Sequence, residues 1–143
     1  MDKQFDAIVS MSDDAKIAYL KAFTHLASID GKFDDNEKAY IKSLAEQYVV
    51  PVERMDEIFK IEKDDEIIKS VSSIKNRRAA LELIKELCFL AHVDDELSDE
   101  ETLFIGRIGQ AMGVELEKIE QISNWVIDRI ISAEEAKVIF EEV

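Results

Sequence analysis

An internal repeat constrains the fold of this chain more than any other feature of its sequence. Sliding the chain by 64 positions without gaps places residues 15–58 on residues 79–122, and 11 of the 44 aligned pairs are identical. The apolar positions coincide as well, at the three- and four-residue spacing of one helix face. The stripe of the first copy is Tyr19, Leu20, Phe23, Leu26 and Ala27, and that of the second is Leu83, Ile84, Leu87, Leu90 and Ala91. Each copy therefore begins with an amphipathic helix.

Two further apolar stripes follow in each copy and predict two more helices. The second helix carries Tyr40, Ile41, Leu44 and Tyr48 in one copy, and Phe104, Ile105, Ile108 and Met112 in the other. The third, shorter helix carries Val52, Met55, Ile58 and Phe59, and then Leu116, Ile119 and Ile122. One such unit is too small to hide its apolar stripes alone, whereas two stacked units would bury them.

The predicted fold is therefore all-α. We expect a compact helical bundle of two pseudo-symmetric three-helix units plus a C-terminal helix over Ser132–Glu142, in a single domain spanning 1–143. The connection 60–75 is expected to hold a short helix at Asp65–Val71. Ser12 is a suitable helix start, and Gly31 and Gly113 lie where helices should end. Six residues are predicted to be nearly fully buried: Phe23, Leu26, Leu44, Leu87, Leu90 and Ile108.

Composition limits the classes of partner. The chain has 143 residues, a net charge of −14 and only 4 glycines and 1 proline, which disfavours a turn-rich β fold. Its negative charge opposes binding to nucleic acid or to anionic membranes, and no apolar run is long enough for membrane insertion. Cations and basic protein patches are the natural partners of an acidic surface, so we expect protein partners. A single cysteine excludes an internal disulfide framework, so we expect a reducing, cytoplasmic location. The sequence gives no oligomeric state.

Several single residues invite a functional interpretation. Cys88, the only cysteine, lies in an apolar stretch and is predicted to be inert core. Trp125 is predicted to be core rather than an exposed anchor. Gly106 and Gly109 are expected to permit close helix approach. The basic cluster Lys69, Lys75, Arg77 and Arg78 is either a solvated helix face or a docking surface for an acidic partner.

Motifs of nucleophilic or metal-dependent enzymes are missing from the sequence, so we expect no enzyme activity.

Acidic stretches follow the first helix of both copies, at 29–37 and 93–101. Helix capping explains most of these acids, because Asp34 and Ser98 suit the N-cap and acidic side chains are favoured in the first turn. Capping does not explain Asp30 and Asp94, which stand at the C-terminal ends of the preceding helices, where a carboxylate opposes the helix dipole. Oxygen-rich turns of this kind suit Ca²⁺ or Mg²⁺. The turns are therefore either caps on an acidic surface or sites for a divalent cation.

The segment from Ala27 to Glu37 also resembles a known family. A helix ending in Ala-x-x-Asp-Gly-x-apolar-Asp-x-x-Glu is similar to the TerB-like family of tellurite-resistance proteins, an architecture shared by the N-terminal part of the co-chaperone DjlA. The second copy, Ala91 to Glu101, is similar but has Asp95 in place of Gly31. The resemblance implies an all-α bundle, a place in bacterial stress-response assemblies, and a divalent-metal site. By position its ligands would be Asp30, Asp34 and Glu37, with Asp94, Asp99 and Glu101 in the second copy. No organic cofactor is expected.

Overall fold

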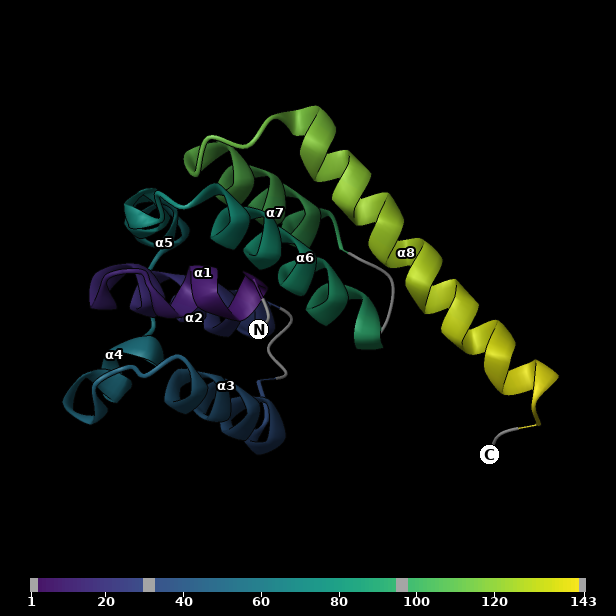
Figure 1. Cartoon of the computed structure of the whole chain (residues 1–143), viewed down its shortest axis with the longest axis horizontal. Coiled ribbons are helices and arrows are strands. Elements are labelled where there is room, and N and C mark those ends of the chain that lie inside the picture. Colours follow the sequence, from purple (N-terminus) through teal and green to yellow (C-terminus); the bar gives the residue numbers. More distant parts are fainter. Residues whose placement is uncertain (1–2, 30–32, 95–97, 142–143) are drawn as a thin grey trace.

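The chain folds into helices joined by short connections (Figure 1). The computed structural model describes residues 3–29, 33–94 and 98–141. Within these ranges no strand forms, so the all-α prediction is confirmed. The elements in chain order are α1 (Lys3–Val9), α2 (Asp13–Ile29), α3 (Asp35–Gln47), the 3₁₀ turn η1 (Val52–Arg54), α4 (Met55–Ile58), α5 (Asp64–Ser70), the 3₁₀ turn η2 (Val71–Ser73), α6 (Arg77–Asp94), α7 (Asp99–Ala111) and α8 (Leu116–Ile139).

Helix α2 forms the centre of the bundle. It contacts α3 and α4 on one side and α5, α6 and α7 on the other, as Figure 1 shows. Eleven of its 17 residues are buried, and four of these are alanines that let neighbouring helices approach closely. A helix that is apolar on nearly all sides must be surrounded. The start predicted at Ser12 is confirmed, because the Ser12 hydroxyl accepts a hydrogen bond from the Ala15 amide at 3.2 Å.

The core follows most of the sequence prediction. Phe23, Leu26, Leu87 and Ile108 are at most 2% exposed. The prediction of near-complete burial is wrong for Leu44 and Leu90, which are only partly buried and pack against the edge of the core. Leu44 belongs to α3, a helix at the margin of the bundle that buries only Ile41 and Ala45. Leu90 lines a surface hollow of about 240 Å³ between α3 and α6.

The two copies share helix bounds in their first two elements and differ in the third. α3 and α7 each have 13 residues and start 64 positions apart. α2 has 17 residues and α6 has 18, and they also start 64 positions apart. The third element is η1 followed by the one-turn α4 in the first copy, but it is the 24-residue α8 in the second. A separate last helix over Ser132–Glu142 is therefore wrong, because no glycine or proline interrupts the chain after Leu116. That the two halves superpose about a two-fold axis remains a prediction.

The ends of α3 and α7 share an unusual backbone conformation. Val49 and Gly113, again 64 positions apart, both have positive φ, at 62° and 80°. The amide of each following residue, Val50 or Val114, returns to the carbonyl five residues earlier, at Ala45 or Gly109. This is the Schellman pattern, which favours glycine at its left-handed position. The prediction for Gly113 is confirmed, whereas Gly31 lies outside the described residues.

Two other features complete the fold. α1 was not anticipated from the sequence, and it places the fully buried Ile8 in the core beside α6. The short helix expected near Asp65–Val71 is present as α5, shifted by one residue. Across the described part of the chain, none of the helices combines the length and the apolarity that crossing a bilayer requires.

Candidate functional site

The acidic turns lie at the N-terminal ends of α3 and α7, where the structure describes part of each. Asp34 is the N-cap of α3, and its Oδ1 accepts a hydrogen bond from the Glu37 amide at 2.8 Å. Ser98 caps α7 in a complete capping box, in which the Glu101 amide donates to Ser98 Oγ at 3.1 Å and Glu101 Oε1 accepts from the Ser98 amide at 3.2 Å. The capping interpretation therefore holds for Asp34, Ser98 and Glu101.

The structure describes the side chains of four of the six predicted metal ligands. Asp30 lies outside the described residues, and so does the side chain of Asp94, although its backbone ends α6. Asp34 and Asp99 are exposed, and Glu37 and Glu101 are half-buried. Among the described side chains, no three His, Cys, Asp or Glu residues stand close enough together to hold an ion.

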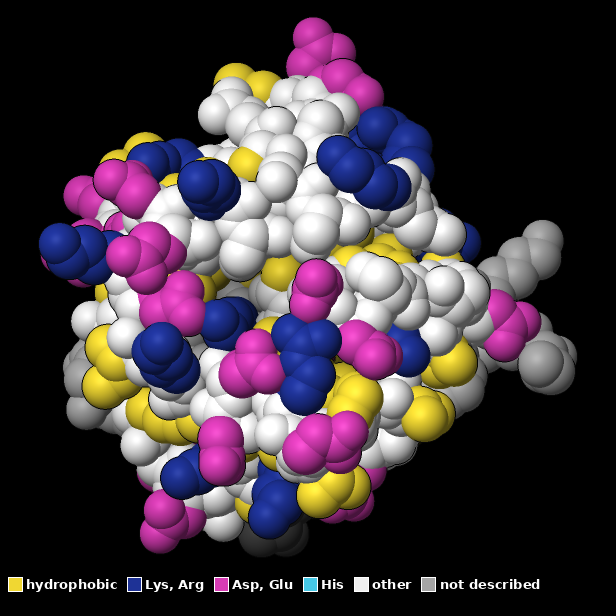
Figure 2. All heavy atoms as spheres, turned by 90° about the vertical axis from the view of Figure 1, so that its left-hand side faces the viewer, with side chains coloured by type: hydrophobic (Ala, Val, Ile, Leu, Met, Phe, Trp, Pro, Cys, Tyr) yellow, Lys and Arg dark blue, Asp and Glu magenta, His cyan; other side chains and the backbone are white. Residues whose placement is uncertain are grey.

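The residues of the basic cluster at 69–78 have different surroundings in the structure. Arg77 donates to Glu115 Oε2 at 2.8 Å, which lowers the pKa of that carboxyl through the hydrogen bond. Arg78 turns toward Glu82, while Lys69 and Lys75 border a different hollow near Arg54. Figure 2 shows one face of the molecule, on which basic and acidic side chains alternate rather than gather by sign. Docking of an acidic partner on this cluster stays a prediction.

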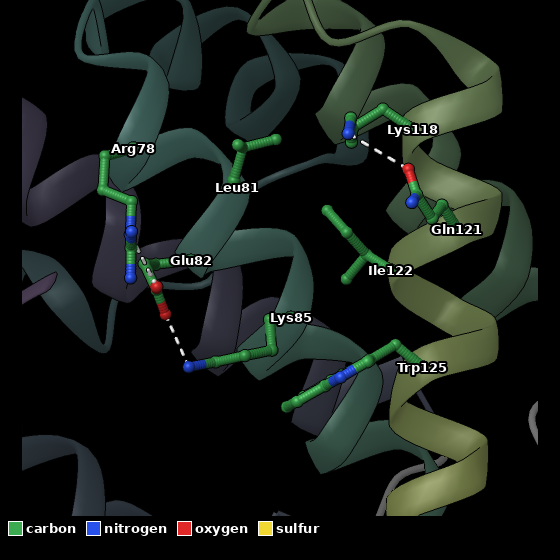
Figure 3. A pocket seen from close by; sticks show the side chains of 8 residues that line it. All are labelled: Arg78, Leu81, Glu82, Lys85, Lys118, Gln121, Ile122 and Trp125. Atoms are coloured by element: carbon green, nitrogen blue, oxygen red, sulfur yellow. Dashed lines mark hydrogen bonds and ion pairs between the residues drawn. The ribbon is translucent and has the colours of Figure 1, made fainter.

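A groove between α6 and α8 is the strongest candidate for a binding site. Its volume is about 450 Å³, and Figure 3 shows its two walls. Leu81 of α6 and Ile122 of α8 face each other across it, and Trp125 extends from α8 toward α6. The complete lining is Arg78, Leu81, Glu82, Lys85, Lys118, Gln121, Ile122 and Trp125. The groove thus combines an apolar floor with charged and polar groups from both helices.

The charges of this groove are positive in excess. Glu82 is largely buried and pairs with Arg78 at 2.9 Å and with Lys85 at 2.5 Å. Lys118, on the opposite wall, donates to Gln121 at 3.0 Å. Three cations against one carboxylate leave a net charge of +2 in the groove, although the whole chain carries −14. An apolar, positively charged groove on an acidic protein favours acidic ligands.

Trp125 forms the lower end of the groove and is not core. Its side chain is 45% exposed. The ring meets Phe89 edge to face with centroids 6.2 Å apart, and the Arg129 guanidinium lies 4.7 Å from the ring centroid. The prediction of a core tryptophan is therefore wrong, because α8 turns the neighbouring Val126 inward and leaves Trp125 at its flank. Position 125 also lies beyond the repeated segment 79–122. This is the one sequence signal that distinguishes Trp125 from the core residues of the repeat.

The other singled-out residues are structural. Cys88 is 1% exposed, and burial raises the pKa of its thiol to about 11, as expected for inert core. Gly109 permits the predicted close approach, since a Cβ there would lie 2.5 Å from Ile119 Cδ1. Gly106 does not, because a Cβ there would meet nothing within 4 Å. His25 is partly buried, with Nε2 2.5 Å from Asp64 Oδ1.

Comparison with known proteins identifies the class. The family model described as tellurite resistance protein TerB matches residues 16–124. That range runs from the fourth residue of α2 through α7 and into the first part of α8. It is well over half of the chain, so the protein belongs to the TerB family. No curated protein and no solved structure matches it. The match ends just before Trp125, so one end of the groove and the distal part of α8 lie outside it.

Proposed function

We propose that this chain is a non-enzymatic protein-interaction module of the TerB family, acting in a bacterial stress-response assembly of the tellurite-resistance type. Its partner would present an acidic segment with an apolar anchor, which the groove between α6 and α8 binds. The observation that carries this proposal is the exposed Trp125 in a groove with a surplus of positive charge.

The groove has the composition of an interaction hot spot. Tryptophan and arginine are enriched among the few interface residues that contribute most of the binding energy. For tryptophan the reason is its large ring, which buries much apolar area. Leu81 and Ile122 supply an apolar floor beside the ring. Arg78 and Lys118, one on each wall, would steer an acidic segment into the groove. No covalent chemistry is required for this role.

Affinity capture with the full chain as bait tests this proposal. Trp125→Ala and Lys118→Glu should each remove captured proteins, while Ile61→Ala, at a side chain 94% exposed between α4 and α5, should capture the same set as the wild type. Because Trp125 is the only tryptophan, its fluorescence should shift to shorter wavelength when a captured partner is added back. Identical capture by all four proteins would contradict the proposal.

A second candidate function is binding of Ca²⁺ or Mg²⁺ at the acidic turns. It is supported by the repetition of the acids at a spacing of 64 and by the exposure of Asp34 and Asp99. Capping occupies Oδ1 of Asp34, and a carboxylate has a second oxygen that can bind a hard cation. Asp30 and Asp94 would complete the two sites. The bound ion would offset the mutual repulsion of these carboxylates and so hold the turns together.

A further inference from the structure

Both helices of the groove begin at the same end of it. Arg78 is the second residue of α6 and Lys118 is the third residue of α8. Figure 3 shows their side chains at one end of the groove, with Trp125 toward the other end. The N-terminus of a helix carries a partial positive charge from its unpaired amide groups. Two helix N-termini and two cationic side chains therefore meet at this end, where they favour an anion.

The first turn of α6 carries charges of the unfavourable sign. The other long helices, α2, α3, α7 and α8, each have an acidic residue in the first turn. α6 has none and begins with Arg77 and Arg78, and a cation at this position opposes the helix dipole. Arg77 pairs with Glu115 and does not line the groove. The dipole therefore does not account for the two arginines, and Arg78 is the one that the groove contains.

Glu82 holds the Arg78 side chain in one orientation. Its side chain is only 8% exposed, and Oε1 accepts a hydrogen bond from Arg78 Nε at 2.9 Å. The other oxygen, Oε2, pairs with Lys85 Nζ at 2.5 Å. A buried carboxylate with two charged partners has little freedom to move, and it fixes the guanidinium that it binds.

The terminal nitrogens of Arg78 are available to a ligand. Among the described residues, its guanidinium makes a hydrogen bond through Nε alone, and neither Nη nitrogen donates to another residue. The side chain is 54% exposed and lines the groove. The edge formed by the two Nη groups presents parallel N–H donors that match the two oxygens of one carboxylate. Arg78 is thus a preoriented bidentate donor.

We propose that Arg78 binds a carboxylate of the partner through this edge, with Glu82 as its positioning residue and Lys118 as a second contact from the opposite wall. This inference rests on the proposed function, because it names the group that the groove recognises in its acidic partner. Arg78 then determines specificity, since a lysine at position 78 would keep the charge but lose the paired donors.

The segment that carries this carboxylate is an amphipathic helix antiparallel to α6 and α8. Each wall of the groove exposes residues at the spacing i, i+3, i+4 and i+7, a length of about two turns, or about 10 Å. They are Arg78, Leu81, Glu82 and Lys85 on α6, and Lys118, Gln121, Ile122 and Trp125 on α8. A groove of this kind suits the apolar stripe of a third helix. In the antiparallel orientation, the negative C-terminal end of the partner helix meets the two positive N-termini. Its carboxylate is then in the last turn, and its apolar anchor lies two turns earlier, at Trp125.

Titration of the full chain with capped peptides tests the inference through the fluorescence of Trp125, the only tryptophan. The probe is an alanine-rich helical peptide of about 16 residues, with two leucines three residues apart and a glutamate four residues after the second. The wild type should bind it at least about tenfold more tightly than the same peptide with glutamine. Arg78→Lys should weaken binding of the glutamate peptide about tenfold, whereas Arg77→Lys, the same change beside the groove, should change Kd less than about twofold.

Substitutions at Glu82 separate positioning from charge. Glu82→Leu removes the one carboxylate of the groove. Charge alone predicts tighter binding of the glutamate peptide by this variant and an unchanged effect of Arg78→Lys in its background. Positioning predicts that Arg78→Lys then weakens binding less than about threefold, because Arg78 has no fixed orientation left to lose. Glu82→Gln retains an acceptor oxygen for Arg78 Nε and should restore most of the difference between arginine and lysine.

The outcomes separate this inference from the proposed function. Equal binding of the glutamate and glutamine peptides, or equal effects of Arg78→Lys and Arg77→Lys, would overturn the inference. A peptide with phosphoserine in place of glutamate should bind within about tenfold of the glutamate peptide, and a stronger preference for it would overturn the carboxylate assignment. An unchanged effect of Arg78→Lys in Glu82→Leu would overturn the positioning role. If the inference fails while Trp125→Ala still loses captured proteins, the proposed function stands.

Discussion

Replacing Gly109 by alanine should destabilise the protein, although alanine is the better helix former. A Cβ at position 109 would lie 2.5 Å from Ile119 Cδ1, 2.9 Å from Ile119 Cγ1 and 3.3 Å from Ile84 Cδ1. Ile119 is 6% exposed and has little room to move. Overpacking of this kind costs about 1–3 kcal/mol, against a gain of about 1 kcal/mol in helix propensity. We expect a net loss of about 1 kcal/mol.

Gly106 in the same helix provides the matched control. Its Cβ would meet nothing within 4 Å, so Gly106→Ala should stabilise the fold by about 1 kcal/mol through propensity alone. In thermal unfolding, Gly109→Ala should lower the melting temperature by about 3 °C and Gly106→Ala should raise it by a similar amount. Urea titration with an unchanged slope should give the same signs.

A second substitution identifies the cause of the loss. Ile119→Val removes the Cδ1 atom that stands 2.5 Å from the new Cβ, so Gly109→Ala should cost less in the Ile119→Val background. Gly109 also bears on the groove, because it packs against Ile119 near the start of α8, from which Lys118 and Ile122 line the groove. If both glycine variants are equally stabilising, or if Ile119→Val changes nothing, α7 and α8 are not packed as described.

Three further predictions concern the core, the metal and alkaline pH. Leu87→Ala, at a fully buried residue, should lower the free energy of unfolding by about 2–5 kcal/mol. Leu90→Ala, at the edge of the core, should lower it clearly less, and equal losses would contradict this difference in burial. Ca²⁺ or Mg²⁺ should raise the melting temperature above that of a monovalent salt control of matched ionic strength, and Asp30→Asn should remove most of that rise. A rise equal to that of the control would show that the acidic residues only cap the helices and bind no divalent cation. Burial raises the pKa of Cys88 to about 11 and that of Tyr48 to about 12, so both protons are lost first from the unfolded chain. Stability should therefore be complete below about pH 9 and fall as pH rises toward 11 and 12, and urea unfolding at stepped pH should give a shallower fall in Cys88→Ala.

Local signals in the sequence determined most of the helical framework. Apolar spacing and capping residues located α2, α3, α6 and α7, because these depend on neighbours within one turn of helix. Ser12, Asp34 and Ser98 each cap the helix predicted for them. The family resemblance, read from the segment between Ala27 and Glu37, is confirmed by the match over residues 16–124.

Tertiary packing decided the features on which the candidate site depends. Apolar residues predict burial but do not show which side of a helix packs against a neighbour. The sequence therefore predicts full burial for Leu44 and Leu90 and a core position for Trp125, and the structure shows that both predictions are wrong. The matched apolar stripes also do not predict the length of the third helix of each copy. It stops after one turn in α4 and continues for 24 residues in α8. The groove joins Arg78 and Leu81 of α6 to Lys118 and Trp125 of α8. Residues about forty positions apart become neighbours only when two helices pack, and no local periodicity encodes that contact.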